Sequence, residues 1–331
     1  MDPTLFSTLV MLAVVLLFLM PSAAVTVYAE RRVSAFIQNR YGPNRVGPMG
    51  LFQPFADVIK LFLKEDIIPT GANRFLYTLA PMIPVTTAVI TVGVIPFSEH
   101  VYIADLNIGV LYLLAVASLS VYGVTLAGWA SNSKYSLLGG LRAAAQMISY
   151  ELPMGVALAS VILFAGSLSV LDIVNSQDIW WNIFRNPIGF VIFTVAVFAE
   201  ANRTPFDLVE AEQELVGGFH TEYSSMKFGT FFLAEYMHVV IGSMLITTFF
   251  FGGYHLPFAG YWLPEMSVLA KSILDIFVFI AKTVFWVFVF IWVRWTIPRF
   301  KYNQLMRLGW TRMLPIAILN FAVLAVILYY L

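Results

Sequence analysis

Residues 199–235 read AEANRTPFDLVEAEQELVGGFHTEYSSMKFGTFFLAE, and this stretch carries seven of the nineteen carboxylates in a chain of 331 residues. Apolar runs flank it on both sides, at Ile179–Ala199 and Phe228–Phe251. Each run has about the length of 20 residues that a helix needs to cross a bilayer. The stretch therefore predicts an acidic connection between two membrane spans.

The composition of the whole chain supports a membrane protein. It is 60% hydrophobic and only 11% charged, whereas soluble domains spend about a quarter of their residues on charge. The net charge is zero, so the chain lacks the excess of basic residues that is typical of nucleic-acid-binding proteins. Cysteine is absent, which excludes disulfides and cysteine-ligated iron–sulfur clusters within this chain. No dinucleotide or phosphate-binding glycine motif occurs, and the four histidines lack metal-ligand spacing.

Hydropathy predicts an all-α polytopic membrane protein with about eight transmembrane helices plus cytoplasmic amphipathic helices. We treat residues 1–331 as a single membrane domain with cytoplasmic loops at 29–74, 131–141, 200–227 and 294–312. The expected spans are Leu5–Tyr28, Phe75–Phe97, Ile108–Ala130, Leu141–Ala165, Ile179–Ala199, Phe228–Phe251, Val268–Val293 and Met313–Leu331.

The distribution of basic residues predicts the orientation. Sixteen of the nineteen Lys and Arg side chains fall in the loops after the first, third, fifth and seventh spans. Arg185 and Lys271 lie on the opposite side, and Lys282 is inside a span. This asymmetry places those loops in the cytoplasm and both termini outside.

The acidic stretch carries helix signals of its own. Thr204 suits an N-cap, Pro205 suits the first helical position, and Gly217-Gly218 suits the end of the helix. Within it, Asp207, Glu210 and Glu214 are spaced three and four residues apart, so a helix would present them on one face. The alternative is a solvated acidic loop.

Several ionisable residues fall inside or beside apolar runs, where a charge costs roughly 2.5–3.5 kcal/mol. Glu151 lies in the fourth span, Glu200 closes the fifth, and Glu235 lies about two turns into the sixth. Together with the acidic helix they favour a proton relay, while each alone is also explained by a helix–helix hydrogen bond. Asp275 and Lys282 share a face of the seventh span, and a structural ion pair is at least as good an explanation for them.

The first loop divides into two parts. Residues 41–48 are rich in Gly and Pro and predict a series of turns. Residues 52–64 place apolar side chains on one helical face and charged ones on the other, which predicts an amphipathic helix too short to span. We expect this helix to lie in the membrane interface or to pack against a neighbouring subunit. The alternative is that it only anchors the loop.

These motifs resemble a known family. The segments QNRYGPNRVGP (38–48), GLFQPFADVIKLFLKE (50–65) and SNSKYS (131–136), together with residues 199–215 and 234–236, are similar to the H-type membrane subunit of respiratory complex I. That enzyme is the proton-pumping NADH:quinone oxidoreductase, and the mitochondrial form of the subunit is called NADH dehydrogenase subunit 1. The resemblance runs from about Glu30 to the last span.

The resemblance implies a subunit that lines the quinone access tunnel and carries a proton path toward the antiporter-like subunits, without being catalytic alone. The residues it assigns to the tunnel are Arg31, Arg40, Phe55, Asp57, Arg203 and Phe232. The residues it assigns to the proton path are Glu151, Glu200, Asp207, Glu210, Glu212, Glu214 and Glu235.

The resemblance also implies partners. Quinone would bind at an interface, while FMN and iron–sulfur clusters would reside in partner subunits, the hydrophilic ones on the cytoplasmic side. Small membrane subunits would be further partners, in a bacterial inner membrane. Alternatives are a related complex driven by ferredoxin, a reduced deazaflavin or a membrane hydrogenase, a stand-alone ion-coupled transporter, and a scaffold for soluble subunits. The quinone type and the electron donor stay open at this point.

Overall fold

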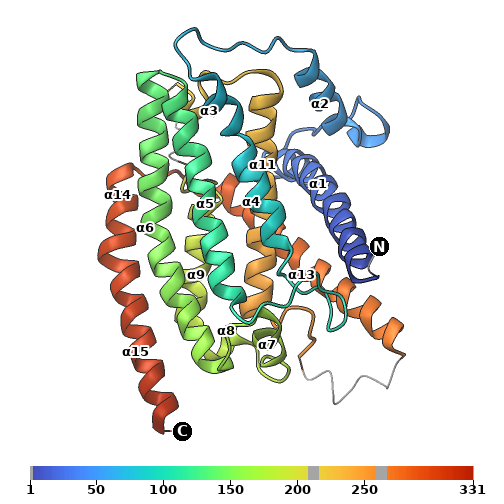
Figure 1. Cartoon of the computed structure of the whole chain (residues 1–331), viewed down its shortest axis with the longest axis vertical. Helices are drawn as coiled ribbons and strands as arrows, with labels where there is room; N and C mark the ends of the chain where they lie inside the picture. Colours follow the sequence, from blue (N-terminus) through green and yellow to red (C-terminus); the bar gives the residue numbers. More distant parts are fainter. Residues whose placement is uncertain (1–2, 208–215, 258–266, 331) are drawn as a thin grey trace.

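The computed structural model of the chain describes residues 3–207, 216–257 and 267–330 (Figure 1). Within these ranges the chain is helical, and strand-like pairing is limited to an isolated bridge between Ser98 and Val101. This confirms the predicted all-α class.

The helices follow one another along the chain with short connections. The longer ones are α1 (Pro3–Ile37), α4 (Met82–Val92), α5 (Gly109–Ala130), α6 (Lys134–Ala165), α9 (Pro187–Glu200), α11 (Ser225–Phe250), α13 (Val268–Thr296) and α15 (Leu314–Tyr330). The shorter ones are η1 (Pro48–Gly50), α2 (Gln53–Leu63), α3 (Arg74–Leu79), α7 (Val170–Asn175), α8 (Asn182–Arg185), η2 (Gly218–His220), α14 (Tyr302–Arg307) and the π-helical turn η3 (Leu308–Met313).

Six helical segments of the described chain are long and apolar enough to cross a membrane, which confirms a polytopic membrane protein. They are Arg74–Val92, Gly109–Ala130, Lys134–Ala165, Ser225–Phe250, Val268–Thr296 and Tyr302–Tyr330. The predicted first span lies within α1, a helix of 35 residues.

The helices form a bundle in which α6 and α11 make most of the packing (Figure 1). Helix α6 lies against α5, α9 and α15, and α11 lies against α1, α4, α9 and α13. Helix α15 forms one edge of the bundle and α1 the other, while α2 lies beyond one end of it (Figure 1). We call this the α2 end, and the opposite end, which carries α7 and α8, the α7 end.

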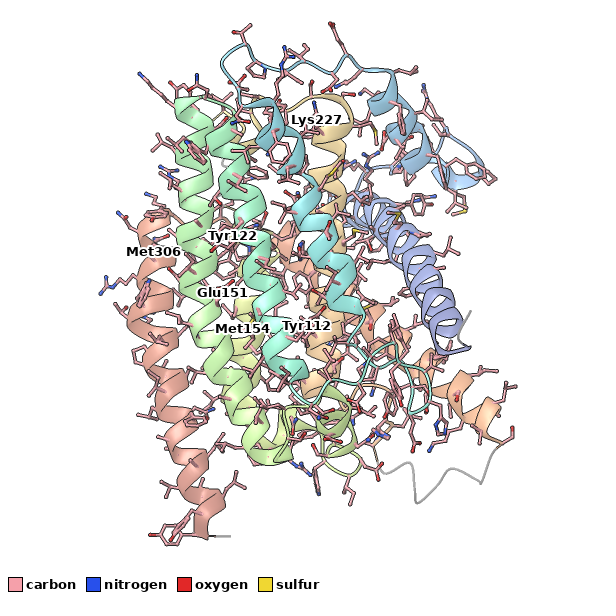
Figure 2. All side chains as sticks on the ribbon, viewed as in Figure 1. Tyr112, Tyr122, Glu151, Met154, Lys227 and Met306 are labelled. Carbon is pink, nitrogen blue, oxygen red and sulfur yellow. The ribbon has the colours of Figure 1, made fainter. Side chains whose placement is uncertain are left out.

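The first loop closes over the α2 end. Its helix α2 confirms the predicted amphipathic helix, and residues 41–47 are non-helical as expected. Phe55, Phe62 and Leu63 on α2 are largely exposed, so its apolar face covers little of this chain. Lys227, at the start of α11, ties the loop down by an ion pair with Asp66 at 2.8 Å (Figure 2).

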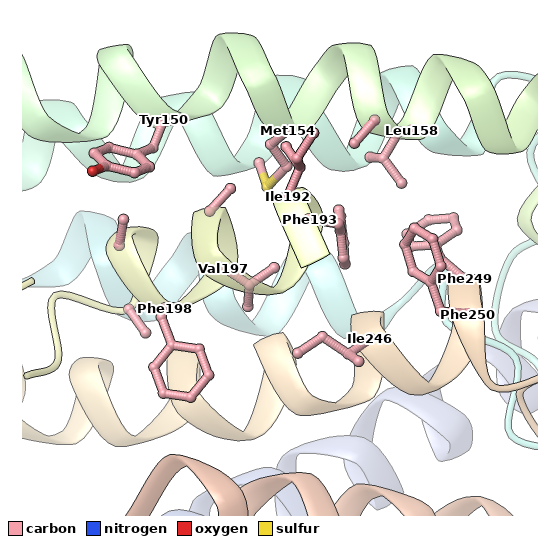
Figure 3. Close-up of a cluster of buried hydrophobic side chains, with 14 of the residues drawn as sticks. Tyr150, Met154, Leu158, Ile192, Phe193, Val197, Phe198, Ile246, Phe249 and Phe250 are labelled. Carbon is pink, nitrogen blue, oxygen red and sulfur yellow. The ribbon is translucent and has the colours of Figure 1, made fainter. Parts of the chain in front are cut away.

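A core of aliphatic and aromatic side chains joins α6, α9 and α11 (Figure 3). Met154 and Leu158 come from α6, Phe193 from α9, and Phe249 and Phe250 from α11, and all are almost fully buried. The rings of Phe193 and Phe250 lie 5.3 Å apart. This packing holds the middle of α9 against α6 and against the end of α11.

The predicted fifth span, Ile179–Ala199, is wrong in its first part. The backbone breaks at Asn186, and α9 begins only at Pro187, so the helix has 14 residues and a length of about 21 Å. The Asn186 side chain accepts a hydrogen bond from the Gly189 amide, donates to Ser160 and accepts from Asn320. These three hydrogen bonds to buried partners stabilise the break in the helix at Asn186.

Two of the predicted loops are shorter in the structure. Helix α6 begins at Lys134, seven residues before the predicted span, and the last helical segment begins at Tyr302, eleven residues before it. Continuing a helix satisfies the backbone hydrogen bonds even where the side chains have become polar. Hydropathy therefore underestimated these helices.

The structure does not pair Asp275 with Lys282. Ser98 donates a hydrogen bond to Asp275, whereas the Lys282 ammonium donates to the backbone carbonyls of Phe251, Gly253 and His255 at 2.6–2.9 Å. Lys282 also lies 4.5 Å from the centroid of the Trp181 ring. The ammonium therefore satisfies backbone carbonyls of the non-helical segment that follows α11.

We predict that Lys282→Met destabilises the protein by roughly 3–5 kcal/mol, because it leaves these carbonyls without their charged donor. The matched control is Lys271→Met on the same helix. Lys271 pairs with Glu99 at 2.7 Å, but both side chains are more than 40% exposed, so the loss should not exceed about 1 kcal/mol. Thermal denaturation in native membranes measures both, and equal losses would contradict the capping role.

Candidate functional site

Four charged side chains meet inside the bundle, near its α2 end. Glu30 comes from α1, Arg203 from the segment after α9, Glu235 from α11 and Arg294 from α13. Arg294 lies 2.6 Å from one Glu30 oxygen, and Arg203 lies 4.0 Å from the other. Arg203 also lies 3.7 Å from Glu235. We call these four residues the charge cluster.

The charge cluster is balanced, with two carboxylates and two guanidinium groups. Glu30 and Arg203 are both less than a tenth exposed. Charges buried to this degree are tolerated only when paired, because desolvation costs several kcal/mol per ion. Tyr236 adds a cation–π contact, with its ring centroid 4.1 Å from the Arg203 guanidinium carbon.

Asp207 has a separate partner. It is buried, and its carboxylate pairs with Arg299 at 3.0 Å. The backbone amide of Phe300 donates to the Pro205 carbonyl, and the Phe206 ring packs against Tyr150. These contacts hold the segment after α9 against α6 and against the residues that follow α13.

The predicted helix start at Thr204 and Pro205 is wrong. Residues 204 and 205 form a turn joined by a cis peptide bond, and Thr204, Phe206 and Asp207 are buried. Tertiary packing and the ion pair of Asp207 take precedence over the local capping signal. Gly217 lies in a turn and Gly218 begins η2, while Glu210, Glu212 and Glu214 lie outside the described residues.

Glu200 and Glu235 line one cavity of about 30 Å³. Its remaining polar lining includes Ser120, Asn202 and His238. A cavity needs roughly 10–15 Å³ of such space for one water, so this one has room for a water between the two carboxylates. Gln146 of α6 fixes one wall, since its amide donates to the Ala199 carbonyl and to Asn202.

Glu151 continues this series along α6. It lies halfway along the helix, on the side that faces α5 (Figure 2). The Ser118 hydroxyl of α5 lies next to its carboxylate, and Glu151 is near enough to Glu200 for the two charges to interact. The structure thus places Glu235, Glu200 and Glu151 in sequence from the charge cluster to the middle of the bundle.

The structure places the residues expected near a quinone in two groups, and Arg40 lies apart from both. Arg31 of α1 and Asp57 of α2 form an ion pair at 2.7 Å, and Phe55 lies exposed on the same α2. Phe232 of α11 contacts Tyr236, and the Tyr236 ring makes the cation–π contact with Arg203. Arg40 is exposed in the loop and donates to Gln38.

The two groups are held close together by α2 itself. Helix α2 packs on α1 and on α11, where Ser225 donates to the Leu61 carbonyl. Phe232 is one turn further along α11 than Gly229, whose position contacts Leu61. The aromatic side chains of α11 therefore connect the α1–α2 region with the charge cluster.

Sequence reasoning did not select Glu30, Arg294 or Arg299 as functional residues, although they are the direct partners of the predicted ones. A signal was available, because Glu30 and Arg294 both end long apolar runs. Within the described residues no group of three or more potential ligands could hold a metal ion.

Comparison with known proteins agrees with the motifs. The sequence profile of the NADH dehydrogenase family matches residues 10–325. The chain is 58% identical to NADH-quinone oxidoreductase subunit 8 of Rhodothermus marinus over 98% of both chains. It is 58% identical to an NADH-quinone oxidoreductase subunit of Salinibacter ruber, over 92% of this chain and 91% of that one. A third such subunit, from Geobacter metallireducens, is 49% identical over 94% of this chain and 93% of its own.

We predict that Arg203→Gln destabilises the protein by about 3–5 kcal/mol, because it removes the buried guanidinium group that lies between Glu30 and Glu235. Adding Glu235→Gln should recover part of the loss, since the double variant restores the charge balance. Arg40→Gln, in the exposed loop, is the control and should change stability by less than about 0.5 kcal/mol. Thermal denaturation of Arg203→Gln, Glu235→Gln, the double variant and the control checks this, and additive losses in the double variant would contradict the pairing.

Proposed function

The chain belongs to the NADH dehydrogenase family, and on that premise we propose that it is the membrane subunit of an NADH:quinone oxidoreductase that couples quinone reduction to proton movement. In this proposal the α1–α2 region lines the quinone access route, and the buried carboxylates carry protons away from it. The subunit supplies no redox cofactor. FMN and iron–sulfur clusters belong to partner subunits that dock over the α2 end.

One observation carries the proposal. The charge cluster stands between the α1–α2 region and the cavity that Glu235 shares with Glu200. Acids that only held helices together would need no shared cavity, whereas proton transfer between carboxylates needs a hydrogen-bonded path. Charged side chains within the membrane are costly, and a functional path is the default explanation for them.

The geometry supports a sequence of proton positions. Arg203 lies between Glu30 and Glu235, so a change of charge near Arg31 and Asp57 alters how strongly Arg203 holds the Glu235 carboxylate. A proton taken up by Glu235 passes through the shared cavity to Glu200 and from there to Glu151. In this proposal, protons reach Glu235 from the quinone side through the acidic residues Asp207, Glu210, Glu212 and Glu214.

We further propose the setting that the family implies. The protein lies in a bacterial inner membrane with both termini outside, consistent with the basic residues of the predicted cytoplasmic loops. Small membrane subunits and antiporter-like subunits would receive the protons. NADH is the favoured electron source over ferredoxin, a deazaflavin or hydrogen, because the similar curated proteins are named as NADH-quinone oxidoreductase subunits.

We predict that Glu235→Gln and Glu200→Gln each lower the rate of proton translocation by about tenfold or more, because the amide keeps the size of the side chain but cannot carry a proton. Translocation is measured in vesicles containing the complete complex, alongside reduction of an artificial acceptor upstream of quinone. Glu99→Gln, on the exposed loop after α4, is the control. Wild-type coupling in both buried variants would remove them from the path.

The quinone route has its own test. Asp57→Asn breaks the pair with Arg31 and should raise the KM for quinone up to about fivefold, since a pair of this exposure is worth at most about 1 kcal/mol. Asp66→Asn breaks a pair of similar length with Lys227 in the same loop and should leave the KM unchanged. Equal KM values for the two variants would argue against a quinone route at α1–α2.

A further inference from the structure

A buried histidine lies beside the proposed proton path and is not used by it. His238 follows Glu235 by three residues on α11, so the two side chains lie on the same face of the helix. Its ring is hydrogen-bonded to the backbone carbonyl of Pro84 in α4. Its Nε2 atom is buried and has no hydrogen-bond partner in the part of the chain that the structure describes.

An unpartnered buried nitrogen costs about 1–3 kcal/mol, so its presence needs a physical reason. A histidine that served packing alone would be improved by any apolar side chain of similar size. A metal site does not supply the reason, since the described residues contain no cluster of potential ligands.

The cavities around His238 supply one. His238 and Glu200 line the cavity shared with Glu235, and the same two residues line a second cavity of about 30 Å³. The second cavity extends between Thr91 of α4 and Phe249 of α11 and is otherwise mostly apolar. Among the described residues only these two line both cavities, so their side chains form the wall between them.

We propose that His238 carries protons across this wall, from the cavity that Glu235 and Glu200 share to the second cavity. The proposal rests on the proposed function, because it adds a carrier to that path. Nε2 takes up one proton from a water or carboxyl group in the first cavity, which makes the ring an imidazolium cation. Nε2 then releases that proton to a water in the second cavity, and the ring returns to its neutral form.

The contact with Pro84 suits this role. Because Nε2 has no partner among the described residues, we assign the hydrogen bond to the Pro84 carbonyl to Nδ1, and the proposal keeps the proton on that atom. The carbonyl therefore fixes the orientation of the ring and stabilises the imidazolium while it exists. Because Nε2 both takes up and releases the proton, the imidazole ring does not have to rotate during the transfer.

His238→Asn tests the proposal in the complete complex. The asparagine amide still has a donor for the Pro84 carbonyl but cannot take up a proton near neutral pH. We expect proton translocation in vesicles to fall about tenfold or more, while the amount of assembled complex and its melting temperature stay at the wild-type values. Glu235→Gln and Glu200→Gln are measured in parallel.

The outcomes separate the two proposals. Wild-type translocation by His238→Asn, with loss in both glutamine variants, would overturn the role of His238 and leave the carboxylate path standing. Wild-type translocation by all three variants would remove the path and this inference with it. If His238→Asn and the longer His238→Gln both prevented assembly, the ring would be a packing element and the proposal would be wrong.

Discussion

The position of Arg203 between the buried Glu30 and the half-buried Glu235 is the constraint from which much of this structure follows. Glu30 and Glu235 come from α1 and α11, and Arg203 contacts both while Arg294 completes the balance. Buried ions lose their hydration and regain it only through close partners. Four segments of the chain are therefore obliged to meet at one place.

This arrangement also joins two parts of the molecule that differ in character. The α1–α2 region is half-exposed, with a short ion pair and apolar side chains that cover little of this chain. The interior beyond Glu235 is enclosed and offers room for single waters. Arg203 and Tyr236 form the boundary between the two. A change of charge on the open side reaches the enclosed side through one guanidinium group, which is the physical basis of the coupling we propose.

Backbone polar groups impose a second constraint in an apolar bundle. Where helices end inside it, side chains replace the missing partners, as Lys282 does for α11 and Asn186 for the start of α9. Each is a polar residue in an apolar run, and neither takes part in the series of carboxylates. Some polar side chains inside the bundle thus form hydrogen bonds with backbone groups at helix ends, and others take part in the proposed proton path. The residues of the second kind can be distinguished because they line a cavity together.

The sequence by itself determined the membrane class, the positions of most spans, the amphipathic helix at residues 53–63 and the family, because hydropathy and long motifs are local properties that need no partner. It also indicated Glu235 and Glu200, since a carboxylate in an apolar run is visible without a fold.

Only the tertiary structure decided which charges meet. The pairing of Arg203 with Glu30, of Asp207 with Arg299 and of Lys282 with carbonyls joins residues from 27 to 173 positions apart, and no spacing rule connects them. The same holds for the turn at Thr204, where local capping preferences of about 1 kcal/mol yield to tertiary packing and to the ion pair of the buried Asp207 with Arg299. Charge pairing inside a bundle is set by which helices pack together, and that is a property of the whole chain.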